Sequence, residues 1–200
     1  MAPVLGVILA GGLSRRMGGG DKPLRVLAGS TLLDRVVERF TPQCGAGVIL
    51  NANGDPARFS EFSGLVVPDE MPDHPGPLAG ILAALDHAAS HHPSTTHLAS
   101  VTGDAPFLPL DLVERLHAER AGSAIAMASS AGREHFTVAL WAVSLREDLR
   151  AALVERGERR VGAFLARHGA VAVEWPAEPV DPFLNINTPE DLALAEALLR

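Results

Sequence analysis

A loop rich in glycine and positive charge follows the first apolar run of the chain. Residues 9–24, LAGGLSRRMGGGDKPL, contain five glycines, two adjacent arginines and one lysine. Because glycine loses much conformational entropy on folding, such a cluster indicates that the backbone turns sharply or passes close to another group. Backbone N–H groups could crowd around phosphate oxygens here, while Arg16 and Lys22 supply charge-assisted hydrogen bonds. The loop therefore favours binding of a nucleoside triphosphate; the alternative is an ordinary flexible loop with solvated arginines.

Lys22 is the only lysine among 17 basic side chains, the other sixteen being arginine. A single lysine inside this loop indicates a position that needs a compact ammonium rather than a planar guanidinium. The alternative explanation is that the single lysine occurs in this loop by chance.

Four further positions carry polar or unusual residues next to or within apolar segments. Asp104 directly follows the run HLASVTG, where a carboxylate could hold Mg²⁺ together with phosphate oxygens, or could simply form a turn or helix cap. Asn51 and Asp69 also stand at the ends of apolar runs, where they could be turn residues rather than functional ones. Gly80 interrupts the helical pattern PLAGILAALDHAA. Since glycine weakens a helix, it indicates close approach of backbone or ligand.

The elements that must position these residues alternate between two patterns. Continuous apolar runs predict parallel strands at 4–9, 47–51, 65–67, 97–103 and 124–129. Between them, residues 30–40, 77–89 and 110–120 have helical periodicity, the first with Ser30 or Thr31 as its cap. The alternation predicts a three-layer α/β/α sandwich with a mostly parallel, Rossmann-like sheet.

The second half departs from strict alternation. Strands are expected at 135–143 and 170–175, with a helix over REDLRAALVERG between them, so we expect an antiparallel element at an edge of the sheet. The final helix begins with Thr188 as N-cap, Pro189 at its first position and Asp191 three residues after the cap. No linker or repeat interrupts the sequence, so residues 1–200 are expected to form one domain.

Composition narrows the classes of function. The chain has 200 residues, 47% of them hydrophobic, and a formal net charge of −7. This acidic balance argues against nonspecific binding of nucleic acid. A single cysteine, Cys44, suits a reducing compartment. No signal peptide or membrane-spanning run is recognisable, so we expect a cytoplasmic protein without a membrane partner.

Two common phosphate-binding motifs are excluded. A P-loop requires a Gly-Lys pair, which the sequence lacks, and GGLSRRMGGG does not match the G-x-G-x-x-G fingerprint at a strand–helix junction.

The loop instead resembles the signature of the MobA-type molybdenum cofactor guanylyltransferases, LAGG-x-S-x-RMG followed by DK. Other segments resemble later motifs of that family in the same order, across nearly the whole chain: NAN (51–53), PD (68–69), GPLAG (76–80), GDAPFLP (103–109), REHFTVAL (133–140), GERRV (157–161) and NINTPEDL (185–192). The resemblance implies a nucleotidyltransferase-like fold. It also implies transfer of GMP from GTP to the phosphate of the molybdopterin cofactor, with release of pyrophosphate.

The resemblance also assigns roles to residues of this chain. On the nucleotide side it implies contacts from Leu9, Ala10, Gly11, Gly12, Ser14, Arg16, Lys22, Asn51, Asp69, Gly80 and Asp104. Among these, Arg16 would hold the β- and γ-phosphates, Lys22 would neutralise charge at the α-phosphate, and Asp104 would bind Mg²⁺. Cations are the expected machinery, because an anionic phosphate must attack an anionic α-phosphorus. His135, Asn185 and Asn187 would lie on the pterin side.

Two positions depart from the family pattern. Asn187 stands where relatives often have aspartate, and Phe136 stands where proline is common, so the details of the pterin side are open. A related family of cytidylyltransferases has LAAG where this chain has LAGG, and lacks GPLAG. Because a smaller residue leaves room for the larger purine, the resemblance implies guanine rather than cytosine. A cytidylyltransferase acting on the same cofactor remains an alternative, as does a non-catalytic nucleotide- or cofactor-binding protein. GTP and the molybdopterin cofactor are the expected partners, with cofactor-insertion proteins or molybdoenzyme chaperones as further ones.

Overall fold

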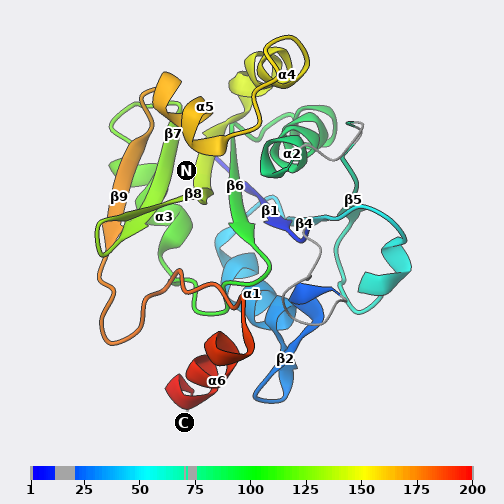
Figure 1. The fold of residues 1–200 in the computed structure, drawn as a ribbon. Helices are drawn as coiled ribbons and strands as arrows, with labels where there is room; N and C mark the ends of the chain where they lie inside the picture. Colours follow the sequence, from blue (N-terminus) through cyan, green and yellow to red (C-terminus); the bar gives the residue numbers. More distant parts are fainter. Residues whose placement is uncertain (1, 12–20, 70, 72–75, 200) are drawn as a thin grey trace.

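The fold is a seven-stranded sheet covered by helices on both faces (Figure 1). The computed structural model describes residues 2–11, 21–69, 71 and 76–199. The strands of the main sheet are β1 (Leu5–Leu9), β4 (Val48–Asn51), β5 (Val66–Val67), β6 (His97–Thr102), β7 (Ile125–Ser130), β8 (Arg133–Ala142) and β9 (Val171–Trp175). The α-helices are α1 (Leu32–Phe40), α2 (Pro77–His91), α3 (Leu112–Glu119), α4 (Arg146–Val154), α5 (Val161–Arg167) and α6 (Pro189–Leu198).

Shorter elements connect these. A small hairpin of β2 (Val26–Leu27) and β3 (Ser30–Thr31) precedes α1. Short 3₁₀ helices are η2 (Lys22–Leu24), η3 (Thr41–Gln43), η4 (Pro56–Phe59) and η5 (Val143–Leu145). The sequence patterns did not predict the hairpin or α5, because both are too short to show a clear period.

The strand order is β5-β4-β1-β6-β8-β7-β9. Neighbouring strands from β5 to β6 are parallel, as are β7 and β9, whereas β8 is antiparallel to both of its neighbours. The mostly parallel sheet with one antiparallel element is confirmed. The expectation that this element lies at an edge is wrong, because β8 lies inside the sheet between β6 and β7.

A tight turn explains the interior position of β8. Ala131 and Gly132 connect β7 to β8, and both have positive φ, of 49° and 72°. Positive φ at both central residues is the geometry of the two-residue hairpin that matches strand twist. The strand is then buried on both faces, with Val138 and Leu140 in one core cluster and Ala139 and Trp141 in the other. Ala-Gly is a weak sequence signal for such a turn, so the pairing was not evident from the sequence.

The two core clusters confirm the three layers. Helices α1 and α3 cover one face of the sheet, and α2, α4 and α5 cover the other (Figure 1). Most of their buried side chains belong to the first and the second cluster, respectively. Along β1, Ile8 belongs to the first cluster, whereas Val7 and Leu9 belong to the second. None of the helices in the described chain is both long enough and apolar enough to cross a membrane.

Two helix starts are fixed by reciprocal capping. Thr31 caps α1 and pairs with Asp34, so the choice between Ser30 and Thr31 falls on Thr31. Thr188 caps α6 and pairs with Asp191, as predicted. A small apolar cluster holds α6 against the β2–β3 hairpin; it contains Leu27, Leu32, Ile186 and Ala195. This contact fixes the polar segment just before α6.

Candidate active site

The predicted site residues that the structure describes lie together along the edge of the sheet formed by the carboxyl ends of its parallel strands. Leu9, Asn51 and Thr102 end β1, β4 and β6, and Asp69 and Asp104 follow β5 and β6 by two residues. These strands are parallel, so their carboxyl ends meet, which is where open α/β sheets bind ligands. Because β8 runs the opposite way, its amino-terminal end, with His135, reaches the same edge.

Three side chains from distant segments meet at this edge. The Lys22 ammonium donates hydrogen bonds to the Asp104 carboxylate and, at 2.6 Å, to Oδ1 of Asn187. The side chains of Lys22 and Asp104 are only 18% and 15% exposed. Charge-assisted hydrogen bonds of this kind, partly shielded from water, are stronger than surface ion pairs. The structure thus brings together the predicted catalytic lysine, the predicted metal ligand and one residue predicted on the pterin side.

Local packing sets the position of Lys22. Lys22 begins η2, and the next residue, Pro23, is buried against the loop after β6. A Cβ built on Gly103 would lie 3.1 Å from Cγ of Pro23, so the glycine gives η2 room to approach Asp104.

Backbone hydrogen bonds position the segment 185–187. The N–H of Ile186 donates to the carbonyl oxygen of Asp104 at 3.0 Å. Thr102 Oγ1 donates to Oδ1 of Asn185 at 3.3 Å, and the N–H of Asn187 donates to the Asp191 carboxylate at 2.8 Å. Asp191, which pairs with the N-cap Thr188, therefore also holds Asn187 near Lys22.

One carboxylate oxygen of Asp104 fits a cation. Oδ1 of Asp104 is buried and has no hydrogen-bond partner among the described residues. A buried polar atom without a partner costs free energy unless a ligand satisfies it. Within the same described ranges, no group of three or more His, Cys, Asp and Glu side chains could hold a metal. One carboxylate and the Asn187 carbonyl oxygen suit Mg²⁺, which completes its shell with phosphate oxygens and water.

Asn51 packs into the space left by Gly80. A Cβ built on Gly80 would lie 2.1 Å from Oδ1 of Asn51 and 3.1 Å from Cδ2 of Leu9. Nδ2 of Asn51 donates to the carbonyl oxygen of Val67 at 3.0 Å, and Asn51 is buried. The mid-helix glycine predicted close approach of backbone or ligand, whereas the group that approaches Gly80 most closely here is the side-chain amide of Asn51. Ala10 and Gly11 follow β1 beside it, and a Cβ on Gly11 would meet open space.

Asn53 and Arg58 are functional candidates that the sequence analysis did not single out. Asn53 binds Asp69 reciprocally, with its Nδ2 donating to Oδ2 at 2.6 Å and its Oδ1 accepting from the Asp69 N–H at 3.0 Å. Arg58 forms an ion pair with Asp21 and donates to the carbonyl oxygen of Asn53 at 2.5 Å. Asn53 lies within the motif NAN, which could have identified it. Arg58 had no sequence signal, because its ion-pair partner Asp21 lies 37 positions away.

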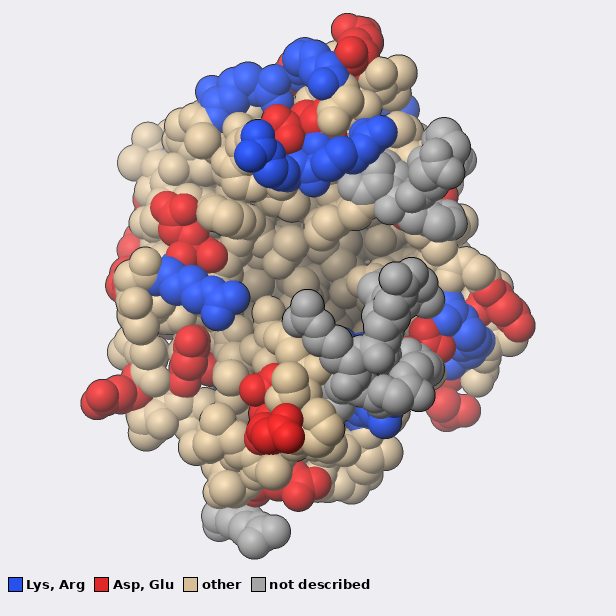
Figure 2. Space-filling view, viewed as in Figure 1, with Lys and Arg blue, Asp and Glu red and all other residues tan. Residues whose placement is uncertain are grey.

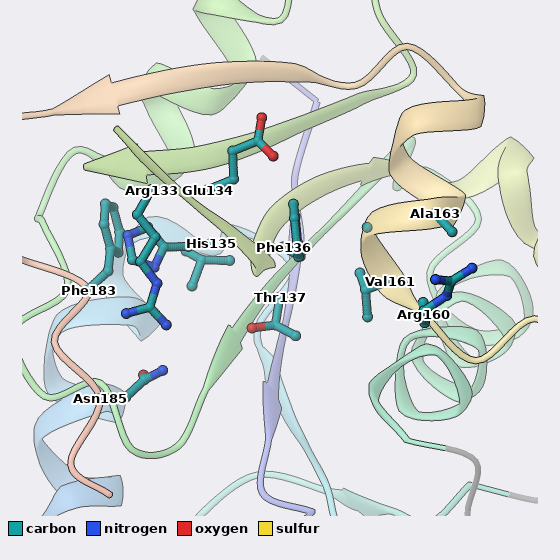
Figure 3. A pocket seen from close by; sticks show the side chains of 12 residues that line it. Arg133, Glu134, His135, Phe136, Thr137, Arg160, Val161, Ala163, Phe183 and Asn185 are labelled. Atoms are coloured by element: carbon teal, nitrogen blue, oxygen red, sulfur yellow. The ribbon is translucent and has the colours of Figure 1, made fainter. Parts of the chain in front are cut away.

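A pocket of about 640 Å³ opens beside Asn185 (Figure 3). In Figure 3, Arg133 and Asn185 lie on one side of it and Arg160 and Val161 on the other, with Phe136 and Thr137 between. This volume lies within the range of small-molecule sites.

His135 lines this pocket, and its ring is held in place by Ser130 and Asp181. Ser130 Oγ donates to the Asp181 carboxylate at 2.9 Å and lies 2.8 Å from Nε2 of His135. Because that hydroxyl proton is used by Asp181, His135 must donate through Nε2–H, which leaves Nδ1 as an acceptor. Burial lowers the pKa of His135 below its usual value of 6.5, although the nearby Asp181 opposes this shift. His135 is therefore neutral at pH 7.

Charge is unevenly distributed over this face. Figure 2 shows the face hollowed in the middle, with basic side chains above the hollow, over α4 and α5, and acidic side chains below it, over α6.

Gly12, Ser14 and Arg16, predicted to hold the phosphates, lie outside the described residues. Their roles stay predictions.

Comparison with known proteins identifies the family of this chain. Residues 6–171 match the model of the MobA-like NTP transferase domain. The molybdenum cofactor guanylyltransferase of Nitrobacter hamburgensis is 54% identical, over 98% of this chain and 94% of its own length. That of Bradyrhizobium sp. is 55% identical, over 98% of this chain and 92% of its own length.

A solved structure extends the likeness to the fold. Molybdopterin-guanine dinucleotide biosynthesis protein A from Archaeoglobus fulgidus has a TM-score of 0.75 at 25% identity, covering 98% of both chains. The mostly parallel sheet is that of the matched family and its solved structure. The chain therefore belongs to the MobA-like NTP transferase family, among the molybdenum cofactor guanylyltransferases.

Proposed function

We propose that this protein transfers GMP from Mg²⁺-bound GTP to the phosphate of the molybdopterin cofactor. An oxygen of the cofactor phosphate attacks the α-phosphorus, and a new P–O–P linkage forms. The bond between the α-phosphorus and the bridging oxygen breaks, and pyrophosphate leaves. The observation that carries this proposal is the contact of Lys22 with Asp104 and Asn187, at the edge where family membership predicts the nucleotide.

Lys22 would lower the electrostatic barrier. Both reacting phosphates are anionic, so the ground state is repulsive and further negative charge develops on the leaving pyrophosphate. A preorganised ammonium compensates this charge without reorganising in the reaction. Its contacts with Asp104 and Asn187 hold the lysine side chain in a defined direction, which reduces the entropy lost when substrate binds.

Asp104 and Asn187 would hold the divalent ion. The partnerless Oδ1 of Asp104 and the amide oxygen of Asn187 are the hard donors that Mg²⁺ prefers. When bound, the ion would supply Lewis-acid stabilisation of the phosphoryl oxygens. Asn187 carries no charge, so most of the ionic attraction would come from Asp104.

The nucleotide side would be formed by the ends of β1, β4 and β5. Leu9, Ala10 and Gly11 would contact the guanine and ribose, with Gly12, Ser14 and Arg16 around the phosphates. Gly80 and Asn51 would shape the base pocket together, because the glycine lets the amide pack closely. Asp69, oriented by Asn53, would provide an acceptor for the nucleotide. A cytidylyltransferase is the alternative within the same chemistry.

The acceptor side would be the pocket next to Asn185. Neutral His135, with its Nδ1 as an acceptor, could receive a hydrogen bond from an N–H group of the pterin. Cofactor-insertion proteins or molybdoenzyme chaperones would receive the product, and a cytoplasmic location suits these substrates.

The test is a nucleotide panel. Each of GTP, CTP, ATP and UTP is incubated with Mg²⁺, molybdopterin and the purified protein, and pyrophosphate and dinucleotide are measured. We expect product from GTP only in the presence of the cofactor. Preference for CTP would overturn the base assignment, and nucleotide binding without pyrophosphate would favour the non-catalytic alternative.

Variants connect turnover to the site. Lys22→Met and Asp104→Asn should each lower kcat by about 10²-fold or more, by analogy with other preorganised charge-stabilising groups. Arg150→Gln is the matched control, since it also removes a positive charge but affects an exposed ion pair with Asp86 on α2. Normal turnover in Lys22→Met would remove the lysine from the mechanism.

A further inference from the structure

Phe136 is an exposed aromatic residue in the acceptor pocket with an unusual backbone environment. The residue is 39% exposed and lies in the first half of β8, whereas Val138–Trp141 in the second half of the strand are buried. It lines the pocket between Arg133 and Arg160 (Figure 3). Single exposed apolar side chains are common on protein surfaces, so the place of this ring inside a pocket, rather than its exposure alone, suits contact with a ligand.

A β-bulge places Phe136 there. Met127 pairs with Ala139, but the next residue, Ala128, pairs with His135, so β8 advances four positions while β7 advances one. Phe136, Thr137 and Val138 form the bulge. Bulges of this kind redirect side chains and are frequent beside active sites.

A buried polar network fixes the bulge. Ser100 Oγ, on β6, donates to the carbonyl oxygen of Thr137 at 2.8 Å, and Trp141 Nε1 donates to Ser100 Oγ at 2.8 Å. Because Ser100 and Trp141 are buried, breaking these bonds would leave polar groups without partners. The direction of the Phe136 side chain is therefore set by the sheet itself.

Gly162 provides the support behind the ring. A Cβ built on Gly162 would lie 2.9 Å from Cε2 and 3.1 Å from Cζ of Phe136. The ring therefore rests against the backbone of the first turn of α5, in space that a side chain at position 162 would occupy. The exposed part of the ring is left for a ligand.

We propose that Phe136, supported by Gly162, is the stacking surface for the planar fused ring of the acceptor, and so a specificity-determining residue. Arg133 and Arg160, both exposed at the pocket rim, suit an acceptor that is planar at one end and anionic at the other. The inference rests on the proposed function for the identity of the acceptor as a pterin phosphate.

The first experiment separates the two substrates. Phe136→Leu and Phe136→Ala should raise KM for molybdopterin about tenfold, within the range measured for loss of an aromatic stacking partner. KM for GTP and kcat should stay within about twofold of the wild-type values. Phe136→Trp retains a planar ring and should keep the KM for the acceptor near the wild-type value.

Gly162→Ala is the second variant, chosen to leave Phe136 in the sequence. The new methyl group should displace the ring and raise KM for molybdopterin without affecting KM for GTP. In a Phe136→Ala background the same change should have no further effect. Circular dichroism and thermal unfolding of each variant report whether the fold is intact.

The outcomes distinguish the inference from the proposed function. If the wild-type protein forms dinucleotide but the Phe136 and Gly162 variants keep its acceptor KM, the stacking role is wrong and the transferase activity stands. If the wild-type protein does not turn over GTP, titration with a free pterin monitored by fluorescence tests the ring directly. Binding that weakens in Phe136→Leu then supports the inference alone, and binding that does not weaken overturns it.

Discussion

Replacement of Gly80 by alanine tests the close contact between α2 and the end of β4. The added Cβ would lie 2.1 Å from Oδ1 of Asn51, far inside van der Waals contact, so the amide must move. Overpacking of this kind costs about 1–3 kcal/mol. Displacing Asn51 also weakens its 3.0 Å hydrogen bond to Val67, a loss of about 1 kcal/mol.

The helix itself gains from the same change. Alanine is more favourable than glycine inside a helix by about 0.5–1 kcal/mol. The net effect of Gly80→Ala should be a loss of about 1–3 kcal/mol in the free energy of unfolding. For a chain of 200 residues, this lowers Tm by on the order of 3–10 °C.

The Asn51→Ala background should reverse the sign. With the Asn51 amide absent, the remaining close atom is Cδ2 of Leu9 at 3.1 Å, the end of a flexible side chain that needs to move by only a few tenths of an ångström. The helix preference then decides the sign. Gly80→Ala should then raise the free energy of unfolding by about 0.5–1 kcal/mol. The double-mutant cycle should therefore give a coupling of at least about 1.5 kcal/mol between the two positions.

Chemical denaturation of the four proteins, followed by circular dichroism, measures the cycle. Equal denaturant slopes would show that the changes affect stability rather than the extent of unfolding. A stabilising effect of Gly80→Ala in the wild-type protein, or additivity within about 0.5 kcal/mol, would refute the contact as the reason for glycine at position 80.

Two further predictions concern the residues around the site. Arg58→Gln should raise KM for GTP several-fold with less than about 1 kcal/mol loss of stability, because Arg58 is an exposed ion-pair partner that holds Asp21 and Asn53 beside the proposed nucleotide site. GTP saturation curves compared with those of Arg150→Gln test this, and an unchanged KM would contradict it. For His135, burial lowers the pKa below 6.5, so its stabilising effect is complete above pH 6.5 and is lost as pH falls. His135→Gln should therefore flatten the fall of Tm from pH 6.5 to 5, and parallel curves for the two proteins would count against this assignment.

The sequence predicted those elements whose signals are local. The Thr188–Pro189–Asp191 start of α6 is confirmed because capping depends only on residues within one turn. The parallel strands are confirmed because strands covered on both faces must be continuously apolar. Lys22 and Asp104 stood out for the same kind of reason, as a unique ammonium in a glycine loop and a carboxylate at a strand end.

The contacts of the site needed the tertiary structure. Lys22 and Asn187 are 165 positions apart, and their segments are brought together by the packing of α6 on the β2–β3 hairpin and by the hydrogen bond from Ile186 to Asp104. The interior position of β8 depends on a two-residue turn without a strong sequence signal. That strand places His135 and Phe136 next to the carboxyl ends of the parallel strands. Residue types and local spacing can be read from the sequence, whereas contacts between distant segments depend on which surfaces pack together. The sequence therefore indicated the chemistry of the site, and the fold decided its geometry.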